Sequence, residues 1–173
     1  MTVPGDTLAD RFTALVEVNA GDVLGYLARR TDQPADAADA LAAVLAIAWE
    51  KSARMPEDAE SGRRWLFVIA RHVLANLGRR RQRKRANELP EFPEVIAAIQ
   101  VHDDALDVRD AVRQLAPKYR EIVMLVHWDG FSLADAAAVC GIRASTARTR
   151  YSRARDQLRT TLAPLRPASA ARR

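Results

Sequence analysis

Apolar residues recur at intervals of three and four positions along most of the chain, and this spacing predicts helices rather than strands. Runs of β-branched residues and Asn-Gly turns are lacking, so no strand is predicted. In the amino-terminal half, apolar positions at residues 8–27 indicate one helix or a helix pair, which ends at the polar segment 31–34. The sequence therefore predicts an all-α fold.

A second helix is predicted over residues 35–51, with Asp36 at its opening, and it is apolar on more than one face. Its larger apolar positions are spread around the helix: Leu41, Val44, Leu45, Ala48 and Trp49. More than one side of this helix therefore needs to be covered.

A loop over residues 52–62 leads to a third predicted helix, residues 63–85. Its apolar positions fall at helical spacing: Trp65, Leu66, Ile69, Val73 and Leu77. By this spacing Trp65 is assigned to the core. The helix ends in a basic run at residues 79–85, interrupted only by Gln82. Such a run either keeps the protein soluble or binds phosphates. The concentration of cations at a helix end favours DNA binding.

The composition of the chain changes after this helix. Residues 86–106 are predicted to form a flexible linker, which is rich in glutamate and proline at its start. Four further helices are predicted at residues 107–115, 117–128, 132–140 and 145–162. The tail at residues 164–173 is expected to be disordered. The organisation is thus two small helical domains, residues 1–85 and 107–163, joined by the linker.

The last two predicted helices have the pattern of a helix-turn-helix. Ser132, followed by Asp135, can cap the first helix, Ala137 allows a close helix approach, and Gly141 supplies the turn. Ser145 is predicted to cap the second helix. One apolar stripe of that helix is expected to face the core: Ala147, Tyr151, Ala154 and Leu158. The residues expected to remain outside are Arg148, Thr149, Ser152, Arg153 and Arg155.

A helix of this kind suits the major groove of DNA, because arginine can bind guanine through two hydrogen bonds and the hydroxyl side chains can hold phosphates. A helical hairpin with a solvated, arginine-rich face has the same pattern and is common in bundles. The pattern alone therefore leaves a recognition helix and an ordinary bundle hairpin both open.

Composition adds limits on partners and location. The formal net charge of +5 favours a polyanionic partner, nucleic acid before a membrane surface, although a merely soluble basic protein has the same excess. Cys140 is the only cysteine, which excludes an intramolecular disulfide and a cysteine-based zinc site and fits a reducing, cytoplasmic location. Acidic residues lie within residues 1–12 and no apolar run approaches ~18 residues, so neither a signal peptide nor membrane insertion is expected.

An enzyme is the alternative of a different class. His72, His102 and His127 are scattered and lack the close spacing of a helical metal site. The sequence also lacks a phosphate-binding glycine loop and a Gly-x-Ser-x-Gly elbow. We therefore expect no catalytic residues, no metal and no cofactor.

Three ordered motifs resemble those of a known family. They are Asp36-Ala37-Ala38-Asp39 with Leu45 and Ala48-Trp49; Arg64-Trp65-Leu66 with Ile69-Ala70-Arg71 and Arg79-Arg80-Arg81; and Leu115-Ala116-Pro117 with Gly130-Phe131-Ser132, Gly141-Ile142 and Arg153-Ala154-Arg155. Through them the chain resembles the extracytoplasmic-function sigma factors from about residue 8 to residue 162. The resemblance implies a sigma region 2 helical bundle in the first domain and a region 4 helix-turn-helix in the second.

The resemblance implies a subunit that binds core RNA polymerase and directs transcription initiation. Docking on core polymerase, at the clamp helices of its largest subunit, is assigned to Asp36, Asp39, Leu41, Leu45 and Trp49. The beta flap is a further implied polymerase contact, to which no residue is assigned. The minus-10 element of promoter DNA is assigned to Asn76, Arg79, Arg80 and Arg81. The minus-35 element is assigned to Arg143, Ser145, Thr146, Arg148, Thr149, Arg150, Ser152 and Arg153. The loop at residues 51–62 is implied to capture a flipped non-template base.

The chain departs from the family pattern in places. Ala38, Ala42 and Ala43 stand where relatives usually have Glu, Gln and Glu, so polymerase docking is expected to be weaker or differently arranged. Relatives are often held inactive by an anti-sigma factor, which is a further hypothesis here. The closer alternative is a helix-turn-helix regulator that binds an operator without polymerase. The amino-terminal motifs argue against it, because they predict binding to polymerase and to single-stranded DNA.

Overall fold

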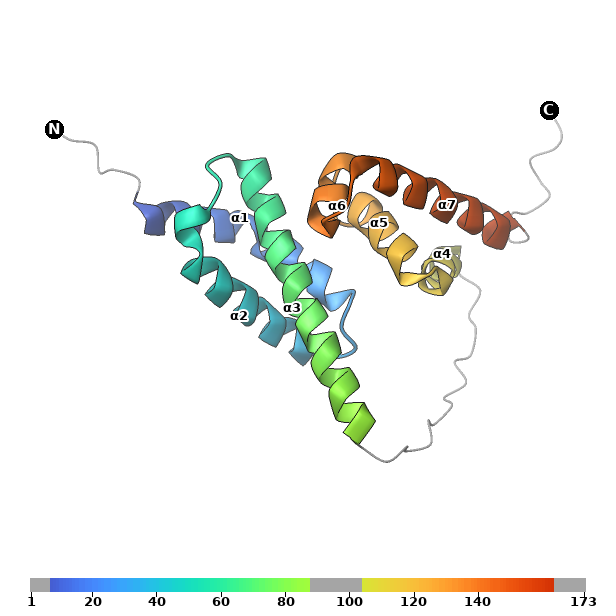
Figure 1. Ribbon diagram of the computed structural model, residues 1–173, viewed down its shortest axis with the longest axis horizontal. Coiled ribbons are helices and arrows are strands. Elements are labelled where there is room, and N and C mark those ends of the chain that lie inside the picture. The colour runs from blue at the N-terminus through green and yellow to red at the C-terminus, as the bar shows by residue number, and fades with distance from the viewer. Residues whose placement is uncertain (1–6, 88–103, 164–173) are drawn as a thin grey trace. The chain divides into compact units, whose positions relative to one another are not determined.

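The computed structural model describes residues 7–87 and 104–163, which fold as seven α-helices and one short 3-10 helix (Figure 1). Neither of these stretches contains a strand, and none of their helices is long and apolar enough to cross a membrane. The chain divides into two compact units, one in each half of the sequence. This arrangement confirms the all-α prediction, and each unit is described by itself.

The amino-terminal unit is a bundle of α1 (Leu8–Ala28), α2 (Pro34–Glu50) and α3 (Ala59–Asn87), with the 3-10 helix η1 (Ser52–Arg54) between the last two. Each of the three α-helices packs against the other two. Thr7 and Asp10 form a capping box at the start of α1, in which each side chain accepts a hydrogen bond from the other's backbone N–H at 3.1 Å. The hydrogen bonds from the Thr7 side chain and backbone hold the pKa of Asp10 below its ordinary value.

Small residues on α2 let the three helices approach closely. One stripe of α2 is almost completely buried: Ala37, Ala40, Val44 and Ala48. Larger side chains from α1 and α3 fill the rest of the core. Tyr26 and Phe67 meet edge to face, with ring centroids 5.1 Å apart. The core of this unit therefore combines a small-residue helix with aromatic residues from its neighbours.

The carboxy-terminal unit contains α4 (Asp104–Gln114), α5 (Pro117–His127), α6 (Leu133–Cys140) and α7 (Ala144–Leu162). α7 contacts all three other helices of this unit. The buried cluster around it comprises Val112, Leu115, Tyr119, Val123 and Ala154, with Met124, Tyr151 and Leu158 packed against it. The four helices predicted for this half are confirmed to within a few residues at each end.

Two helices of the amino-terminal unit begin earlier than predicted. α2 begins at Pro34, one residue before the predicted range 35–51, because proline has no backbone N–H and its φ suits the first helical position. α3 begins at Ala59 rather than residue 63, because the Asp58 carboxylate accepts the Ser61 N–H at 2.8 Å. The first apolar segment is one helix, α1, and not a pair.

Two predictions about single side chains need correction. Arg143 is the N-cap residue of α7, without a side-chain cap, and Ser145 lies inside the helix, so the predicted Ser145 cap is wrong. The turn after Gly141 is so short that Arg143 is already the last extended residue before the helix. Trp65, assigned to the core, is only half-buried.

Arg120 connects α5 to the end of α4. Its Nη2 donates to the carbonyl oxygen of Leu115 at 3.0 Å and to the carbonyl oxygen of Arg113. Carbonyl groups at the end of a helix have no partner within that helix, so this guanidinium satisfies them. Its charge also complements the negative end of the α4 dipole.

Arg120→Met is expected to destabilise the carboxy-terminal unit by about 1.5–3 kcal/mol, because a charged donor to these carbonyls is lost. Native-state hydrogen exchange of buried α5 amides in the full chain measures this free energy of opening. Arg109→Met is the matched control, because Arg109 is exposed on α4. Equal protection in the two variants would contradict the role given to Arg120.

Candidate nucleic-acid interface

α6 and α7 form a helix-turn-helix. Ser132 caps α6: its Oγ accepts the Asp135 N–H at 3.1 Å and donates to the Asp135 carboxylate at 2.5 Å. Gly141 ends α6 with φ of 64°, a left-handed conformation that glycine adopts without steric penalty. Ala137 and Cys140 are buried. The predicted cap, turn and core positions of α6 are confirmed.

α7 has one buried side and one exposed side, as predicted. Ala147 and Ala154 are completely buried, and Tyr151 and Leu158 are half-buried. The residues predicted to remain outside are all exposed: Arg148, Thr149, Ser152, Arg153 and Arg155. α7 therefore presents a hydroxyl-bearing, cationic surface away from its own core.

The arginines of α7 do not share one face. Consecutive residues of a helix are rotated by about 100°, so Arg148 and Arg150 lie on nearly opposite sides, and Arg150 is half-buried. Arg153 lies beside α5, where its hydrogen bond to the Tyr119 hydroxyl is the main cause that lowers the pKa of Tyr119. Arg148 and Ser152 thus form a different part of the surface from Arg150 and Arg153.

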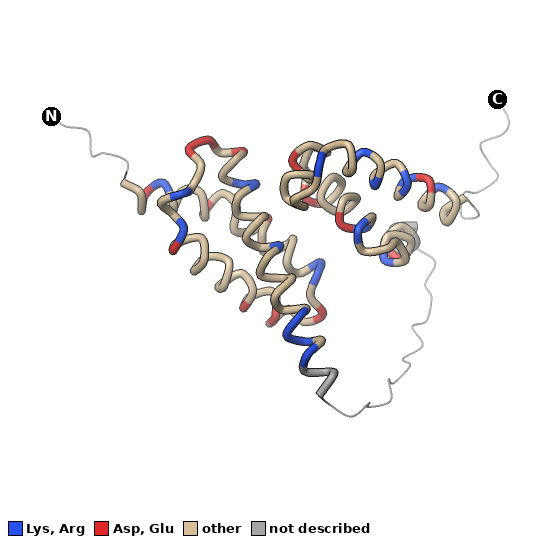
Figure 2. The backbone as a smooth tube through the Cα atoms, viewed as in Figure 1, with Lys and Arg blue, Asp and Glu red and all other residues tan. Residues whose placement is uncertain are grey.

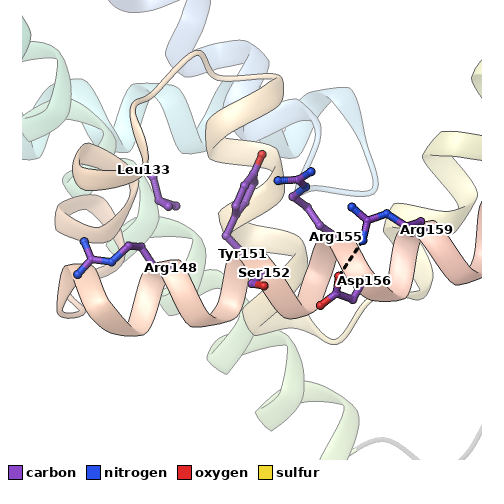
Figure 3. Close-up of a pocket in the computed structure, with 7 residues that line it drawn as sticks. All are labelled: Leu133, Arg148, Tyr151, Ser152, Arg155, Asp156 and Arg159. Atoms are coloured by element: carbon purple, nitrogen blue, oxygen red, sulfur yellow. Dashed lines mark hydrogen bonds and ion pairs between the residues drawn. The ribbon is translucent and has the colours of Figure 1, made fainter.

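A groove of about 270 Å³ runs along the Arg148 side of α7 (Figure 3). It is lined by Leu133 of α6 and by Arg148, Tyr151, Ser152, Arg155, Asp156 and Arg159 of α7. Arg159 Nη1 and Asp156 Oδ1 form an ion pair at 3.0 Å within this lining. Tyr151 is positioned by His127. The Nε2 atom of His127 lies 2.9 Å from the Tyr151 hydroxyl, and the two rings are stacked. The lining therefore carries more positive than negative charge.

The carboxy-terminal part of α3 is densely basic (Figure 2). Arg79 and Arg80 are exposed, and Arg79 donates to the side-chain oxygen of Asn76. Arg81, in contrast, is held by two carboxylates: its Nη1 lies 3.1 Å from Asp32 Oδ2, and its Nη2 pairs with Asp36 Oδ2. Arg81 and Asp36, which were predicted to contact different partners, are therefore joined to each other.

Three of the other residues predicted to dock on a protein partner lie on a different side of α2 from Asp36, whereas Asp39 is rotated from Asp36 by only about 60°. Leu41, Leu45 and Trp49 follow one another at four-residue spacing, whereas Asp36 is rotated by at least about 140° from each of them. Leu41 and Leu45 are half-buried, and Trp49 is 51% exposed with its ring against Phe12 at a centroid distance of 5.2 Å. Next to them lies a row of exposed alanines: Ala38, Ala42 and Ala46. This part of α2 is uncharged over most of its length (Figure 2).

A second pocket, of about 310 Å³, lies between α1 and the loop that precedes α3. α1 contributes Leu15 and Val18, and the loop contributes Met55 and Pro56. Val18, which lines this pocket, is 79% exposed. The cap at Asp58 holds this loop against the start of α3, and its hydrogen bonds from the backbone and side chain of Ser61 lower the pKa of Asp58.

Comparison with known proteins gives the family. Residues 15–84 match Sigma-70 region 2, and residues 105–158 match Sigma-70, region 4. Over 158 residues the chain is 30% identical to the ECF RNA polymerase sigma factor SigL of Mycobacterium tuberculosis, a match that covers 88% of this chain and 89% of SigL. The chain belongs to the extracytoplasmic-function (ECF) sigma factors.

Two further similarities place this sigma factor among its relatives. It is 37% identical over 102 residues to the probable RNA polymerase sigma-C factor of Mycobacterium bovis; this match covers 57% of the chain and only about half of the relative, 55%. Its fold is similar to that of the sigma factor RpoE from Bartonella quintana, solved in complex with the anti-sigma factor NepR. The TM-score is 0.69 at 26% identity, and the match covers 90% of this chain and 98% of that one.

Within this sigma factor, the predicted sets of site residues are only partly brought together. Arg148, Thr149 and Ser152 share the outward side of α7, and Leu41, Leu45 and Trp49 share a side of α2, whereas Arg150, Arg81 and Asp36 lie apart from their sets. Arg159 and Val18 were not foreseen. The spacing 148, 152, 155, 159 could have identified Arg159, and an apolar residue on the polar side of α1 could have identified Val18.

Arg79→Ala is expected to weaken binding of single-stranded DNA more than Arg81→Ala, because two carboxylates already neutralise Arg81. Fluorescence anisotropy of the full chain with an oligonucleotide of about 15 nucleotides, over a salt series, gives the slope of log K against log salt. This slope should fall by about 0.7 for Arg79→Ala and by much less for Arg81→Ala.

Asp32→Asn/Asp36→Asn is the matched control for this pair, because it removes both carboxylates from Arg81 and should tighten binding. If Arg81→Ala reduces affinity and slope as much as Arg79→Ala, the carboxylates do not withhold Arg81 from DNA.

Proposed function

We propose that the protein binds core RNA polymerase and directs it to promoters by recognising minus-10 and minus-35 elements in DNA. The match to region 2 and region 4 in one chain carries this proposal, because an operator-binding regulator needs only a helix-turn-helix. The role is one of recognition in the cytoplasm and requires no reactive groups, so we expect no enzymatic activity.

The proposed polymerase contact is the side of α2 that carries Leu41, Leu45 and Trp49, together with the neighbouring exposed alanines, beyond which Asp39 lies. An exposed apolar surface of this kind on a helix is typical of protein interfaces. The neighbouring alanines favour close helix–helix packing, since small side chains let two backbones approach. This fits a partner that is itself helical, such as the clamp helices of the largest polymerase subunit.

The proposed minus-10 contact combines the basic end of α3 with the pocket beside Val18. Asn76, Arg79 and Arg80 would bind the strand near its phosphates. The pocket between α1 and the loop before α3 would hold a base turned out of the stack, because its apolar lining offers a surface for the base and its polar rim offers hydrogen bonds. Binding of the exposed base would offset the cost of opening the duplex.

The proposed minus-35 contact is the amino-terminal half of α7. Helix-turn-helix proteins insert this part of the second helix into the major groove. Arg143, Ser145, Thr146, Arg148, Thr149 and Ser152 lie in or next to this half, and Arg150 and Arg153 are candidates for contacts along its other side. The beta flap of polymerase is proposed as the protein contact of the same unit.

An anti-sigma factor is proposed as a regulatory partner. The Bartonella sigma factor, whose fold is similar over 90% of this chain, was solved with such an inhibitor. The same apolar and basic surfaces that would bind polymerase and DNA offer an inhibitor complementary contacts.

Ala42→Arg is expected to abolish binding to core polymerase, because a long cation would separate α2 from a closely packed helix. The measurement is co-elution of the full chain with bacterial core polymerase on size exclusion, followed by run-off transcription. Ala28→Arg, at an exposed position of α1, should leave both unchanged. If the Ala42→Arg variant still co-elutes with core polymerase, this side of α2 is not the polymerase contact. Failure of the unmodified protein to bind core polymerase, together with tight duplex binding, would favour the operator-binding regulator.

Val18→Glu is expected to reduce promoter opening while core binding is retained, because a carboxylate at the pocket would repel the phosphates of an entering strand. Fluorescence of 2-aminopurine in the non-template strand reports opening in the reconstituted complex. Val18→Ser is the control, since it removes apolar surface without adding charge. If Val18→Glu opens promoters as fast as the unmodified protein, the pocket does not receive a base.

A further inference from the structure

The groove on α7 continues the recognition surface beyond the residues proposed to read bases. Arg148, Ser152, Arg155 and Arg159 are separated by four, three and four positions and therefore form one row along the helix. An α-helix rises by about 1.5 Å per residue, so this row extends for about 16 Å. Its carboxy-terminal arginines lie too far along α7 to share the base contacts of its first turns.

The charged side chains that line the groove are mainly cations. Three arginines and a serine hydroxyl line it, against a single carboxylate (Figure 3). The guanidinium carbon of Arg155 lies 5.9 Å from the ring centroid of Tyr151, which is itself held by the hydrogen bond to His127. The exposed Arg155 side chain therefore lies near a ring that is held against α5.

Arg159 is paired with Asp156, but this pair can open. The two side chains are 69% and 65% exposed, and they are three residues apart on one helix. Exposed pairs of this kind contribute little free energy, so a phosphate can replace the carboxylate at small cost. Asp156 would therefore compete with DNA for Arg159 without preventing binding.

We infer that this groove is a phosphate-binding site: Arg155, Arg159 and Ser152 hold the backbone of one DNA strand beside the minus-35 element. The inference rests on the proposed function, because it takes the amino-terminal half of α7 to lie in the major groove. The major groove of DNA is about 12 Å wide, whereas the row of side chains on α7 is about 16 Å long. The end of this row therefore reaches the sugar–phosphate backbone at the edge of the major groove. Contacts there position the protein and carry no sequence information. Asp156 lowers the strength of this sequence-independent contact.

The test compares two duplexes of about 30 base pairs in binding to the full chain. One is selected from genomic fragments by rounds of retention on the protein, and the other has the same composition in scrambled order. The variant Arg155→Ala/Arg159→Ala should weaken binding to both duplexes by the same factor, on the order of tenfold or more. The slope of log K against log salt should fall by nearly 2, because two phosphate contacts are lost.

Two variants control for charge and for the ion pair. Arg155→Lys/Arg159→Lys keeps the cations and should retain most of the slope. Asp156→Asn frees Arg159 and should tighten binding to both duplexes. Arg148→Ala, at the other end of the row, should instead reduce the preference for the selected duplex over the scrambled one.

The inference is overturned if the double alanine variant binds both duplexes with unchanged affinity and slope, or if it loses affinity only for the selected sequence. It is also overturned if the double alanine variant binds DNA as before but no longer binds core polymerase, since the groove would then bind an acidic polypeptide. These results are separable from failure of the proposed function. That failure would appear as no core-dependent transcription by the unmodified protein. The double alanine variant would in that case still show a smaller slope of log K against log salt on duplex DNA.

Discussion

Close packing through alanine is the constraint on which both units depend. A helix whose buried residues are small can approach its neighbours closely, and the partners then supply the large side chains that fill the core. On α2 the stripe includes Ala37, Ala40 and Ala48, and on α7 it consists of Ala147 and Ala154, all of them almost completely buried. Each stripe occupies one side of its helix, so the opposite side remains for other partners. That side is apolar on α2 and cationic on α7.

The arginines differ in what already neutralises them. Arg63 pairs with Asp22 at 3.0 Å and Arg81 with Asp32 and Asp36, so both connect α3 to another part of the amino-terminal unit. Each of these pairs joins two elements of the bundle. The pair between Arg159 and Asp156 lies within one helix and joins no second element. Of these pairs, that of Arg159 can open without separating two elements, which distinguishes it from the pairs that connect the helices of the bundle.

Much of the fold could be predicted from the sequence, because its signals are local. The Ser132 cap, the Gly141 turn and the buried positions of α7 follow from residues within a few positions of one another, and the structure confirms them. The Ser145 cap was wrong because hydroxyl chemistry alone does not decide where the turn ends. The family motifs named the region of each site but not the side on which each residue lies.

The pairing of Arg81 with Asp36 shows most clearly what the sequence could not reveal. The two residues are 45 positions apart, and each belongs to a motif with a different implied partner. Only the packing of α2 against α3 brings them together. Consecutive cations in a sequence suggest one basic surface. Because each residue of a helix is rotated by about 100° from the one before, however, these cations lie on different sides of the helix.

This pairing also bears on how the amino-terminal unit could serve two partners at once. α2 and α3 each bury one stripe in the shared core, so their exposed sides point away from it and a partner on one helix leaves the other accessible. The Arg81 pair fixes the basic end of α3 to the first turn of α2, which sets the position of the proposed DNA contact relative to the proposed polymerase contact. The proposed function requires DNA and polymerase to be aligned, and the Arg81 pair connects the two helices that carry these proposed contacts. The pair thus gives Arg81 a structural role within the unit, whereas Arg79 and Arg80 remain exposed for the proposed DNA contact.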